Sequence, residues 1–356
     1  MTTLEHDQET VVRYRTGNRY YRGPKSDHFD GTLFFNPGGE TPRGLGDVLR
    51  WQLGGHKTSW PKYFQSAFPR VRPDAHVGGD GLRVTMIGHA TMLIQVCGLN
   101  ILTDPVWSDR ASPFAFAGPR RVSKPGVHIC TLPPIDIVLL SHNHYDHMDI
   151  GTLKCLRAMH DPQIVTPLGN DALLHAADPS MHVTTLDWGE HASFRNGVRI
   201  HAAPAHHWSA RGLNDRRMAL WAAFVVETPC GKIYHVGDTG FDEGRNYRKA
   251  AEKFGGFRLA LLPIGAYDPR WFMKAHHQTP EEAVEGMALA KAEHAVGHHW
   301  GTFHLANEPV DEPPQRLARA MGERGLPADR FRAMQPGEVW DVPLVAGDQA
   351  ATGNHG

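Results

Sequence analysis

Short runs of β-type residues, each bounded by glycine or a polar turn, dominate the chain from residue 82 onward. The run IDIVLL at 135–140 is apolar throughout, which predicts a strand that is buried on both faces. The other runs are rich in branched and aromatic residues and also predict strands. They lie at 82–87, 91–96, 100–104, 163–166, 182–186, 198–203, 218–227, 232–237 and 257–264.

Helical patterns alternate with these strands. Residues 279–293 begin with a threonine cap, a proline in the first turn and acidic residues near the start, which together predict a helix. Other helices are predicted at 45–53, 150–159, 170–177 and 243–254. Two runs of antiparallel-looking strands, each followed by helices, indicate an α/β protein with two sheets packed face to face and helices outside.

The domain organisation is predicted from changes in composition and periodicity along the chain. A length of 356 residues suggests roughly two domains or one enlarged α/β domain. Residues 1–80 are rich in Gly, Pro, aromatics and Arg and have little periodicity, so we expect an irregular arm packed on a body at 81–345. The segment 346–356 is expected to be a disordered tail.

The arm contains a basic and aromatic run, VVRYRTGNRYYRGPK at 11–25, with five basic residues, three tyrosines and no acid. We favour a solvated strap whose tyrosines pack on the body. Contact with anionic lipid headgroups or with nucleic acid is the alternative.

Charge and leader composition narrow the class of protein. The formal net charge of -1 gives no whole-chain attraction to nucleic acid or to an anionic membrane, and we expect no nucleic-acid partner. The acidic start does not resemble a signal peptide, and no apolar run reaches the length of about 18 residues that a membrane span needs. We therefore expect a cytoplasmic protein. The 4 cysteines form no CxxC pair and are expected to be free thiols.

The segment SHNHYDH at 141–147 places metal-ligand side chains directly behind the buried strand. His142 and His144 are two residues apart, so at the end of an extended strand they project to the same side. Asp146 and His147 follow where the chain turns. This spacing predicts two imidazoles for one divalent ion and a carboxylate with an imidazole for a second ion. A loop that is His-rich by chance is disfavoured.

Further ligands can come from three other loops at predicted strand ends. The loop PAHHWSAR offers His206 and His207, HVGDTG offers Asp238, and VGHHWGTF offers His298 and His299. Each loop is a weak signal alone, because an Asp before Gly is often only a turn. Together the loops can converge on one rim and complete two coordination spheres.

These motifs resemble a known family. HxHxDH followed by His, Asp and His at strand ends is similar to the metallo-β-lactamase superfamily. The segments IGHATMLIQV, ILTDPVWSDRASPFAFAGPRR, LPPIDIVLLSHNHYDHMD, YDPRWFMKAHHQTPEEAV and HHWGTFHLANEP resemble its N-acyl-phosphatidylethanolamine-hydrolysing phospholipase D branch and bacterial relatives. The resemblance runs from about residue 82 to 315. It implies an αββα sandwich of two mixed sheets with metals at one edge.

The resemblance also implies a ligand set. The family's third ligand directly precedes Trp, which matches His207, and its last precedes WGTF, which matches His299. One ion then takes His142, His144 and His207, and the other takes Asp146, His147 and His299, with Asp238 bridging. Zinc is the expected ion, although these ligands also suit iron or manganese. Asp104 and His89 are expected to lie behind the ligands and hold them in place. A hydrogen-bonded core histidine is an equal alternative for His89.

The implied reaction is hydrolysis by a hydroxide that bridges the two metals, with Asp146 orienting the hydroxide or relaying its proton. The family carries a Gln and then a His in its substrate site, at the places of His276 and His277. We expect His277 to contact the phosphate or another polar group. His276 departs from the family's amide, which leaves the exact substrate open. A polar surface loop is the alternative for both histidines.

The favoured function is a phospholipase D-type phosphodiesterase acting on N-acyl-phosphatidylethanolamine or a related phospholipid. A lactone or ester hydrolase is the runner-up, because the same hydroxide attacks a carbonyl. A nuclease and a non-catalytic metal-binding protein rank lower. The expected partners are a phospholipid or small ester and a membrane surface met peripherally at its inner face, and relatives imply a homodimer.

Overall fold

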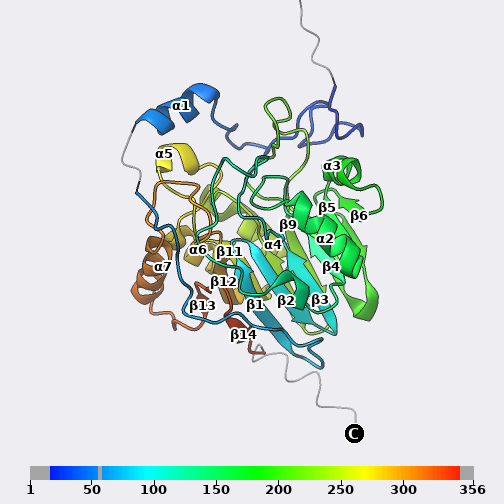
Figure 1. Ribbon diagram of the computed structural model, residues 1–356, viewed down its shortest axis with the longest axis vertical. Coiled ribbons are helices and arrows are strands. Elements are labelled where there is room, and N and C mark those ends of the chain that lie inside the picture. Colours follow the sequence, from blue (N-terminus) through cyan, green and yellow to red (C-terminus); the bar gives the residue numbers. More distant parts are fainter. Residues whose placement is uncertain (1–16, 55–57, 345–356) are drawn as a thin grey trace, which may run out of the picture.

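The computed structural model describes residues 17–54 and 58–344 and consists of two seven-stranded sheets with helices on both outer faces (Figure 1). The first sheet has the order β14 (Val339–Asp341), β1 (Leu82–Gly88), β2 (Thr91–Val96), β3 (Leu99–Thr103), β4 (Ile137–Leu139), β5 (Gln163–Pro167) and β6 (His182–Leu186). The second sheet has the order β13 (Phe331–Arg332), β12 (Ala292–His298), β11 (Phe257–Pro263), β10 (Gly231–His235), β9 (Ala223–Thr228), β8 (Arg199–Ala203) and β7 (His191–Ser193).

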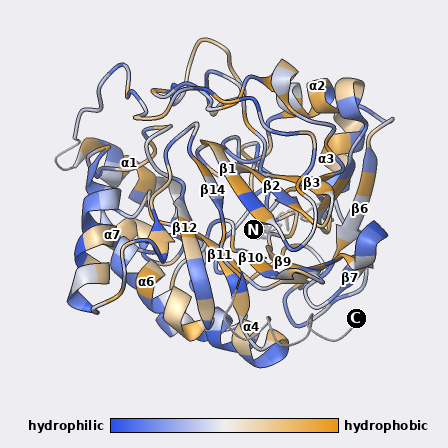
Figure 2. Cartoon of the chain, turned by 90° about the horizontal axis from the view of Figure 1, so that it is seen from below, coloured by the Kyte–Doolittle hydropathy of each residue, from blue (hydrophilic) through white to orange (hydrophobic). Residues whose placement is uncertain are grey.

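The helices are α1 (Leu45–Leu53), α2 (Ile150–His160), α3 (Asn170–Ala177), α4 (Arg245–Phe254), α5 (Arg270–Met273), α6 (Pro280–Leu289) and α7 (Glu312–Glu323). Figure 2 shows α2 and α3 outside one sheet and α4, α6 and α7 outside the other. This is the expected αββα sandwich.

Three apolar layers hold the sandwich together. Side chains such as Ile94 from the first sheet and Phe224 from the second form the layer between the sheets. Leu153 of α2 packs on the outer face of the first sheet, and Val284 of α6 packs on the outer face of the second. Because both faces of most central strands are covered, their apolar runs are continuous rather than alternating.

The expectation of antiparallel strands is wrong for about half of each sheet. Strands β3 to β6 pair in parallel, as do β10 to β13. Helices α2, α3, α4 and α6 each connect two such strands, which is the crossover that parallel pairing requires. The sheets are therefore mixed, as the resemblance implies.

Several predicted boundaries also shift. The helix predicted to reach residue 293 ends at Leu289, because Lys291 has a φ of 54° and the chain then enters β12. The strand predicted from 218 begins at Ala223, because Leu220 and Ala222 hydrogen-bond to Leu168 and Ser141 outside the ladder. The helix predicted from 243 starts at Arg245.

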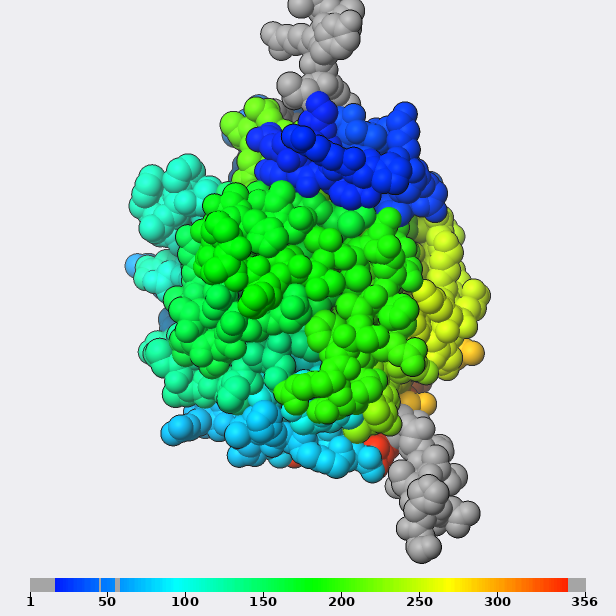
Figure 3. Space-filling view, turned by 90° about the vertical axis from the view of Figure 1, so that its right-hand side faces the viewer, coloured from blue at the N-terminus to red at the C-terminus, as the bar shows by residue number. Residues whose placement is uncertain are grey.

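The described part of the arm lies on the body (Figure 3), where its blue residues cover the green middle of the chain. Phe29 and Phe34 are buried in the apolar layer outside the second sheet. Tyr21 of the basic run packs against Phe29 and Phe34, as a strap would for the described residues 17–25. Residues 11–16 of the run and the predicted tail lie outside the described residues. The boundary near residue 80 stays a prediction.

Candidate metal centre and active site

The predicted ligand loops meet at one edge of the sandwich. The 142–147 segment follows β4, and the loops after β8, β10 and β12 carry His207, Asp238 and His299 to the same place. Their nitrogen and oxygen atoms form overlapping groups that could hold a metal ion. The strand-end argument from the sequence thus places these side chains together.

Three imidazoles form one group. His144 Nδ1 lies 2.9 Å from His142 Nε2 and 3.2 Å from His207 Nε2. Burial, followed by the neighbouring imidazoles, holds the pKa of His142 well below its ordinary value, and burial also dominates at His207. Burial lowers the pKa of His144 to about 4. All three rings are therefore neutral bases near neutral pH, with lone pairs available to a cation.

Two carboxylates and two imidazoles form the second group. His299 Nε2 lies 3.1 Å from both Asp146 Oδ2 and Asp238 Oδ2, and His147 Nε2 lies 3.2 Å from Asp238 Oδ2. Burial alone would lower the pKa of His147, but the carboxylates outweigh it and hold the pKa well above its ordinary value. The same balance raises the pKa of His299 to about 9. The imidazoles hold the pKa of each carboxylate well below its usual range despite burial.

Asp238 joins the two groups. Its Oδ2 lies 3.9 Å from His142 Nε2 and 3.7 Å from His207 Nε2, in addition to its contacts with His147 and His299. No other carboxylate in the described residues forms ion pairs with members of both groups. Asp238 therefore stands where a bridging ligand would be needed.

The donor set fits divalent metal. Asp238 Oδ1 is buried and has no hydrogen-bond partner among the described residues. Imidazole nitrogens that approach each other to about 3 Å, as at His144, need a shared proton or cation between their lone pairs. Imidazole and carboxylate ligands suit zinc, iron and manganese. A buried cluster able to bind metal is thus present.

Asp104 lies behind the cluster, as the sequence predicts. Its Oδ2 is 2.9 Å from His147 Nδ1, and its Oδ1 accepts a hydrogen bond from the backbone of Ser141. Ser141 Oγ also donates to Asp104 and lies 2.9 Å from His142 Nδ1. Sequence reasoning missed Ser141, although it is the first residue of SHNHYDH.

His89 contacts the cluster directly. Its Nε2 lies 2.9 Å from Asp146 Oδ2, so it faces a carboxylate rather than an imidazole. Burial lowers the pKa of His89 to about 3. The neutral ring can hold Asp146 by donating a hydrogen bond, which goes beyond the role of a core histidine.

The two His-His pairs are split by the fold. His206 faces Asp242 at 3.0 Å and His298 packs against the ring of His235. Their neighbours His207 and His299 enter the cluster. In each pair the His next to Trp is the one at the centre, which is the choice that the resemblance implies.

A cavity of about 300 Å³ opens onto the cluster. Its walls are largely apolar and come from distant segments: Trp51, Tyr145, Trp208, Phe272, Met273 and Leu305. The sequence did not indicate that these residues form one pocket, because no local pattern links α1, α5 and the loops after β4, β8 and β12. An apolar wall above a polar floor is typical of a small-molecule site.

His276 and His277 line this cavity and do not form a polar surface loop. His276 is 5% exposed and neither of its ring nitrogens has a partner among the described residues, and His277 Nδ1 is also unpartnered. Burial lowers the pKa of His276 to about 3 and that of His277 to about 4. Both neutral rings are available to a polar group of a bound molecule.

Close backbone packing positions this histidine loop. A Cβ on Gly240 would lie 2.4 Å from the carbonyl oxygen of Ala275, so only glycine lets the Asp238 loop approach the segment that carries His276. The next residue, His276, contacts a different ligand loop, because its carbonyl accepts a hydrogen bond from His207 Nδ1. The segment that carries His276 and His277 is therefore held close to the cluster by backbone contacts.

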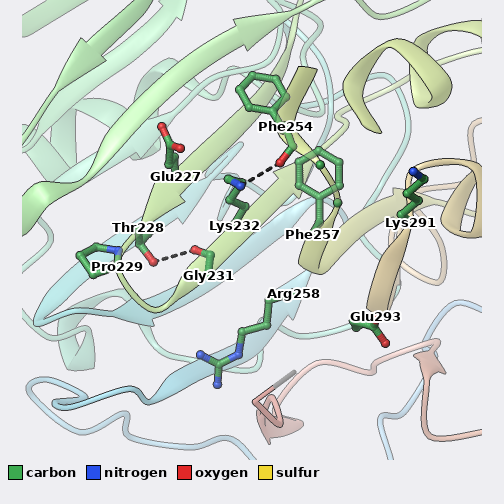
Figure 4. Close-up of a pocket in the computed structure, with 12 residues that line it drawn as sticks. Glu227, Thr228, Pro229, Gly231, Lys232, Phe254, Phe257, Arg258, Lys291 and Glu293 are labelled. Carbon is green, nitrogen blue, oxygen red and sulfur yellow. Dashed lines mark hydrogen bonds between the residues drawn. The ribbon is translucent and has the colours of Figure 1, made fainter. Parts of the chain in front are cut away.

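A second hollow of about 500 Å³ lies around the β9–β10 turn (Figure 4). Two of its cations are engaged: Arg258 donates to the carbonyls of Cys230 and Val342, and Lys232 donates to that of Phe254.

Comparisons with known proteins identify the family of this chain and its fold. The β-lactamase superfamily domain matches residues 99–300. The N-acyl-phosphatidylethanolamine-hydrolysing phospholipase D 1 of Caenorhabditis elegans is 38% identical, over 95% of this chain and 97% of its own length. The mitochondrial enzyme of the same name from Saccharomyces cerevisiae is 35% identical, over 65% of this chain and 50% of its own length. The metallo hydrolase Igni18 of Ignicoccus hospitalis shares the fold, with a TM-score of 0.55 and 21% identity over 74% of this chain and 100% of its own.

Proposed function

Because the chain belongs to the metallo-β-lactamase superfamily, in the branch of the N-acyl-phosphatidylethanolamine-hydrolysing phospholipases D, we propose that it hydrolyses a phosphodiester bond of a phospholipid. The proposed substrate is N-acyl-phosphatidylethanolamine or a close relative. One observation carries the proposal: an apolar-walled cavity ends at the His/Asp cluster, with His276 and His277 beside it.

The proposed cofactor is a pair of divalent cations, most simply zinc. Such ions supply Lewis acidity and make hydroxide available at neutral pH. The residues that would hold them are His142, His144 and His207 for one, and Asp146, His147 and His299 for the other, with Asp238 between.

The chain's own groups would guide the reaction. Asp146 stays ionised because the imidazoles around it hold its pKa low, so it can orient the attacking water or take its proton. His89 would keep that carboxylate in place through its 2.9 Å contact. His277, whose Nδ1 is free, would donate to an oxygen of the phosphate or of the leaving group.

Exposed apolar side chains near the cavity support peripheral contact with a membrane at its inner face. Leu53 is 80% exposed on α1, which also supplies Trp51 to the cavity wall. Trp271 is exposed beside the wall residue Phe272. No helix in residues 17–54 and 58–344 is long and apolar enough to cross a membrane. We propose that a lipid substrate is taken from the surface of a bilayer.

The test combines metal analysis with turnover. Metal content of the purified protein is measured by mass spectrometry, and hydrolysis of N-acyl-phosphatidylethanolamine in mixed micelles is compared with that of a lactone panel. We expect two metals per chain and release of phosphatidic acid and N-acylethanolamine. Asp146→Asn and His277→Ala should lose most of this turnover, whereas His175→Ala on the exposed face of α3 should not.

A lactone or ester hydrolase is the second candidate. It is favoured by His276, which stands where the phospholipase branch carries an amide. Turnover of lactones without turnover of phosphodiesters, at full metal content, would move the function to this candidate. A metal-replete protein inert toward both classes would exclude both.

A further inference from the structure

The arm is hydrogen-bonded to the loop that follows the His207 motif. Within arm residues 17–36, Asn18 Nδ2 donates to the carbonyl of Met218 at 2.8 Å. Arg19 donates to the carbonyl of Asn214 at 2.8 Å. These contacts join segments about 195 residues apart in the sequence. The arm therefore covers a loop that belongs to the catalytic edge of the body (Figure 3).

A buried carboxylate connects the arm to this loop. Asp215 is 2% exposed and its Oδ2 accepts a hydrogen bond from Tyr20 Oη at 2.8 Å. The same carboxylate accepts from the backbone N–H groups of Arg211 and Gly212. Because these donors fold residues 211–215 into a turn around Asp215, the shape of the turn depends on that carboxylate.

Arg211 carries the contact on to the metal motif. Its Nη1 donates to the carbonyls of Asn143 at 3.0 Å and Met148 at 2.8 Å, one on each side of three predicted ligands, His144, Asp146 and His147. Its guanidinium also lies 4.0 Å from the ring centre of Tyr145, and Tyr145 Oη donates to the Arg211 carbonyl. One side chain thus ties together both ends of the 143–148 loop.

The arm reaches the opposite ligand loop as well. Asn36 is buried, and its Nδ2 donates to the carbonyl of His207 at 2.9 Å. Its Oδ1 accepts from the indole of Trp221, which fixes the amide. Two of the loops that supply imidazoles are therefore held from outside by one stretch of the N-terminal arm.

We infer that the arm is a brace for metal binding, acting through the chain Tyr20, Asp215 and Arg211 on the loop 143–148. Arg211 is the positioning residue of this brace, and it contacts neither substrate nor the predicted ligand atoms. The inference rests on the proposed metal-dependent function. It gives the arm a role in the affinity for metal rather than only in covering the body.

The test measures Zn2+ affinity of the full chain by competition with a chromophoric chelator, without substrate. Arg211→Met keeps the aliphatic stem but removes both carbonyl contacts, and we expect Zn2+ to bind about tenfold more weakly or worse. Tyr20→Phe removes one hydroxyl and should weaken binding about threefold. Arg22→Met is the matched control, because Arg22 is an exposed basic residue of the same arm; its Zn2+ affinity should be unchanged.

Two further measurements separate positioning from general stability. Tyr20→Phe should add no further loss to Arg211→Met, since the brace is already cut. Amide hydrogen exchange of residues 143–148 should accelerate in Arg211→Met and be partly restored in Arg211→Lys, which keeps the charge. If Arg211→Met fails to fold, Tyr20→Phe and Arg211→Lys still decide the question.

The brace is wrong if the wild type binds Zn2+ and the folded brace variants bind it equally well, even when their Tm falls. A wild-type protein that binds no Zn2+ would instead defeat the proposed function, and the brace with it.

Discussion

The carboxylate of Asp104 lies directly behind the ring of His147, with 2.9 Å between its Oδ2 and His147 Nδ1. This contact fixes the ring so that Nε2 faces Asp238. Because Asp104 is fully buried and charged, it also raises the basicity of the imidazole. A metal held at Nε2 depends on both effects.

Asp104→Asn should therefore weaken zinc binding about 10- to 100-fold, since the amide has no charge and can present a donor to His147. Chelator competition measures the affinity. Asp329→Asn, at an exposed turn, is the control and should bind zinc like the wild type. Unchanged affinity in Asp104→Asn would show that His147 does not hold the metal through Nε2.

Gly240→Ala should lower kcat/KM by about tenfold or more while metal content stays full. The new Cβ would lie 2.4 Å from the Ala275 carbonyl and push the segment with His276 and His277 away from the cluster. Small displacements of positioned groups cost up to about 100-fold in rate. Steady-state kinetics with metal analysis of the same sample measures the effect.

The control for this change is Gly322→Ala in α7, where an added Cβ meets nothing within 4 Å. It should keep full activity and a Tm equal to or slightly above that of the wild type, because alanine favours helix by about 1 kcal/mol. Equal kinetics in both glycine variants would contradict the role given to Gly240.

Most strands and the residues of the metal cluster could be predicted from the sequence because their signals are local, whereas the short strands β7, β13 and β14 were not predicted. His142 to His147 form one short motif behind a strand, and the remaining ligands follow other strand ends. Pairing direction could not be predicted, since parallel and antiparallel strands place side chains alike. Helix α7 was missed because its start, EPPQRL, reads as a loop, although its two prolines occupy the first turn, where no N–H is needed.

The cavity wall and the brace were beyond sequence reasoning for a different reason. Trp51 stacks on Phe272 at 5.0 Å, although 221 positions separate them (272 − 51). Tyr20 meets Asp215 across a similar separation. Such contacts depend on the path of irregular segments, for which neither periodicity nor spacing provides a signal.

His276→Gln should change KM for the lipid substrate while kcat stays within about threefold. The ring lines the cavity with both nitrogens free, so the amide would alter ground-state contacts with the headgroup. The backbone hydrogen bond from His207 to the residue 276 carbonyl is kept. Kinetics on lipids with different headgroups measures the change; identical KM values throughout would remove His276 from the substrate site.

The pH dependence of stability should include His28, which joins the arm to the body. Its Nε2 lies 2.7 Å from Asp187 Oδ1 and its Nδ1 2.6 Å from Asp27 Oδ1. Burial lowers the pKa of His28, but the hydrogen bonds to these carboxylates outweigh it and raise the pKa above 6.5. The stabilisation is therefore complete below the unfolded pKa and is lost as pH rises through the folded pKa.

The Tm difference between wild type and His28→Gln should thus narrow as the pH rises above about 6.5, because glutamine does not titrate. Thermal scans at constant ionic strength measure it. A Tm difference that stays constant or widens with rising pH would mean that His28 is not protonated in the folded state. The control variant His175→Gln, changed at an exposed site, should have the same Tm as the wild type at every pH.

Metal removal should lower Tm by about 5–10 °C. Each ion that binds only the folded state at 1,000 times its Kd stabilises that state by about 4 kcal/mol, and a protein of this size loses about 1.3 °C of Tm per kcal/mol. Chelation also leaves Asp238 Oδ1 buried without a hydrogen-bond partner among the described residues. Differential scanning calorimetry before and after chelation, and after restoring zinc, measures the shift.

The control is the double variant His142→Ala/His299→Ala, which lacks one imidazole of each group; its Tm should change little on chelation. If the Tm of the wild type is unchanged after the loss of metal has been verified, the cluster does not couple metal binding to folding.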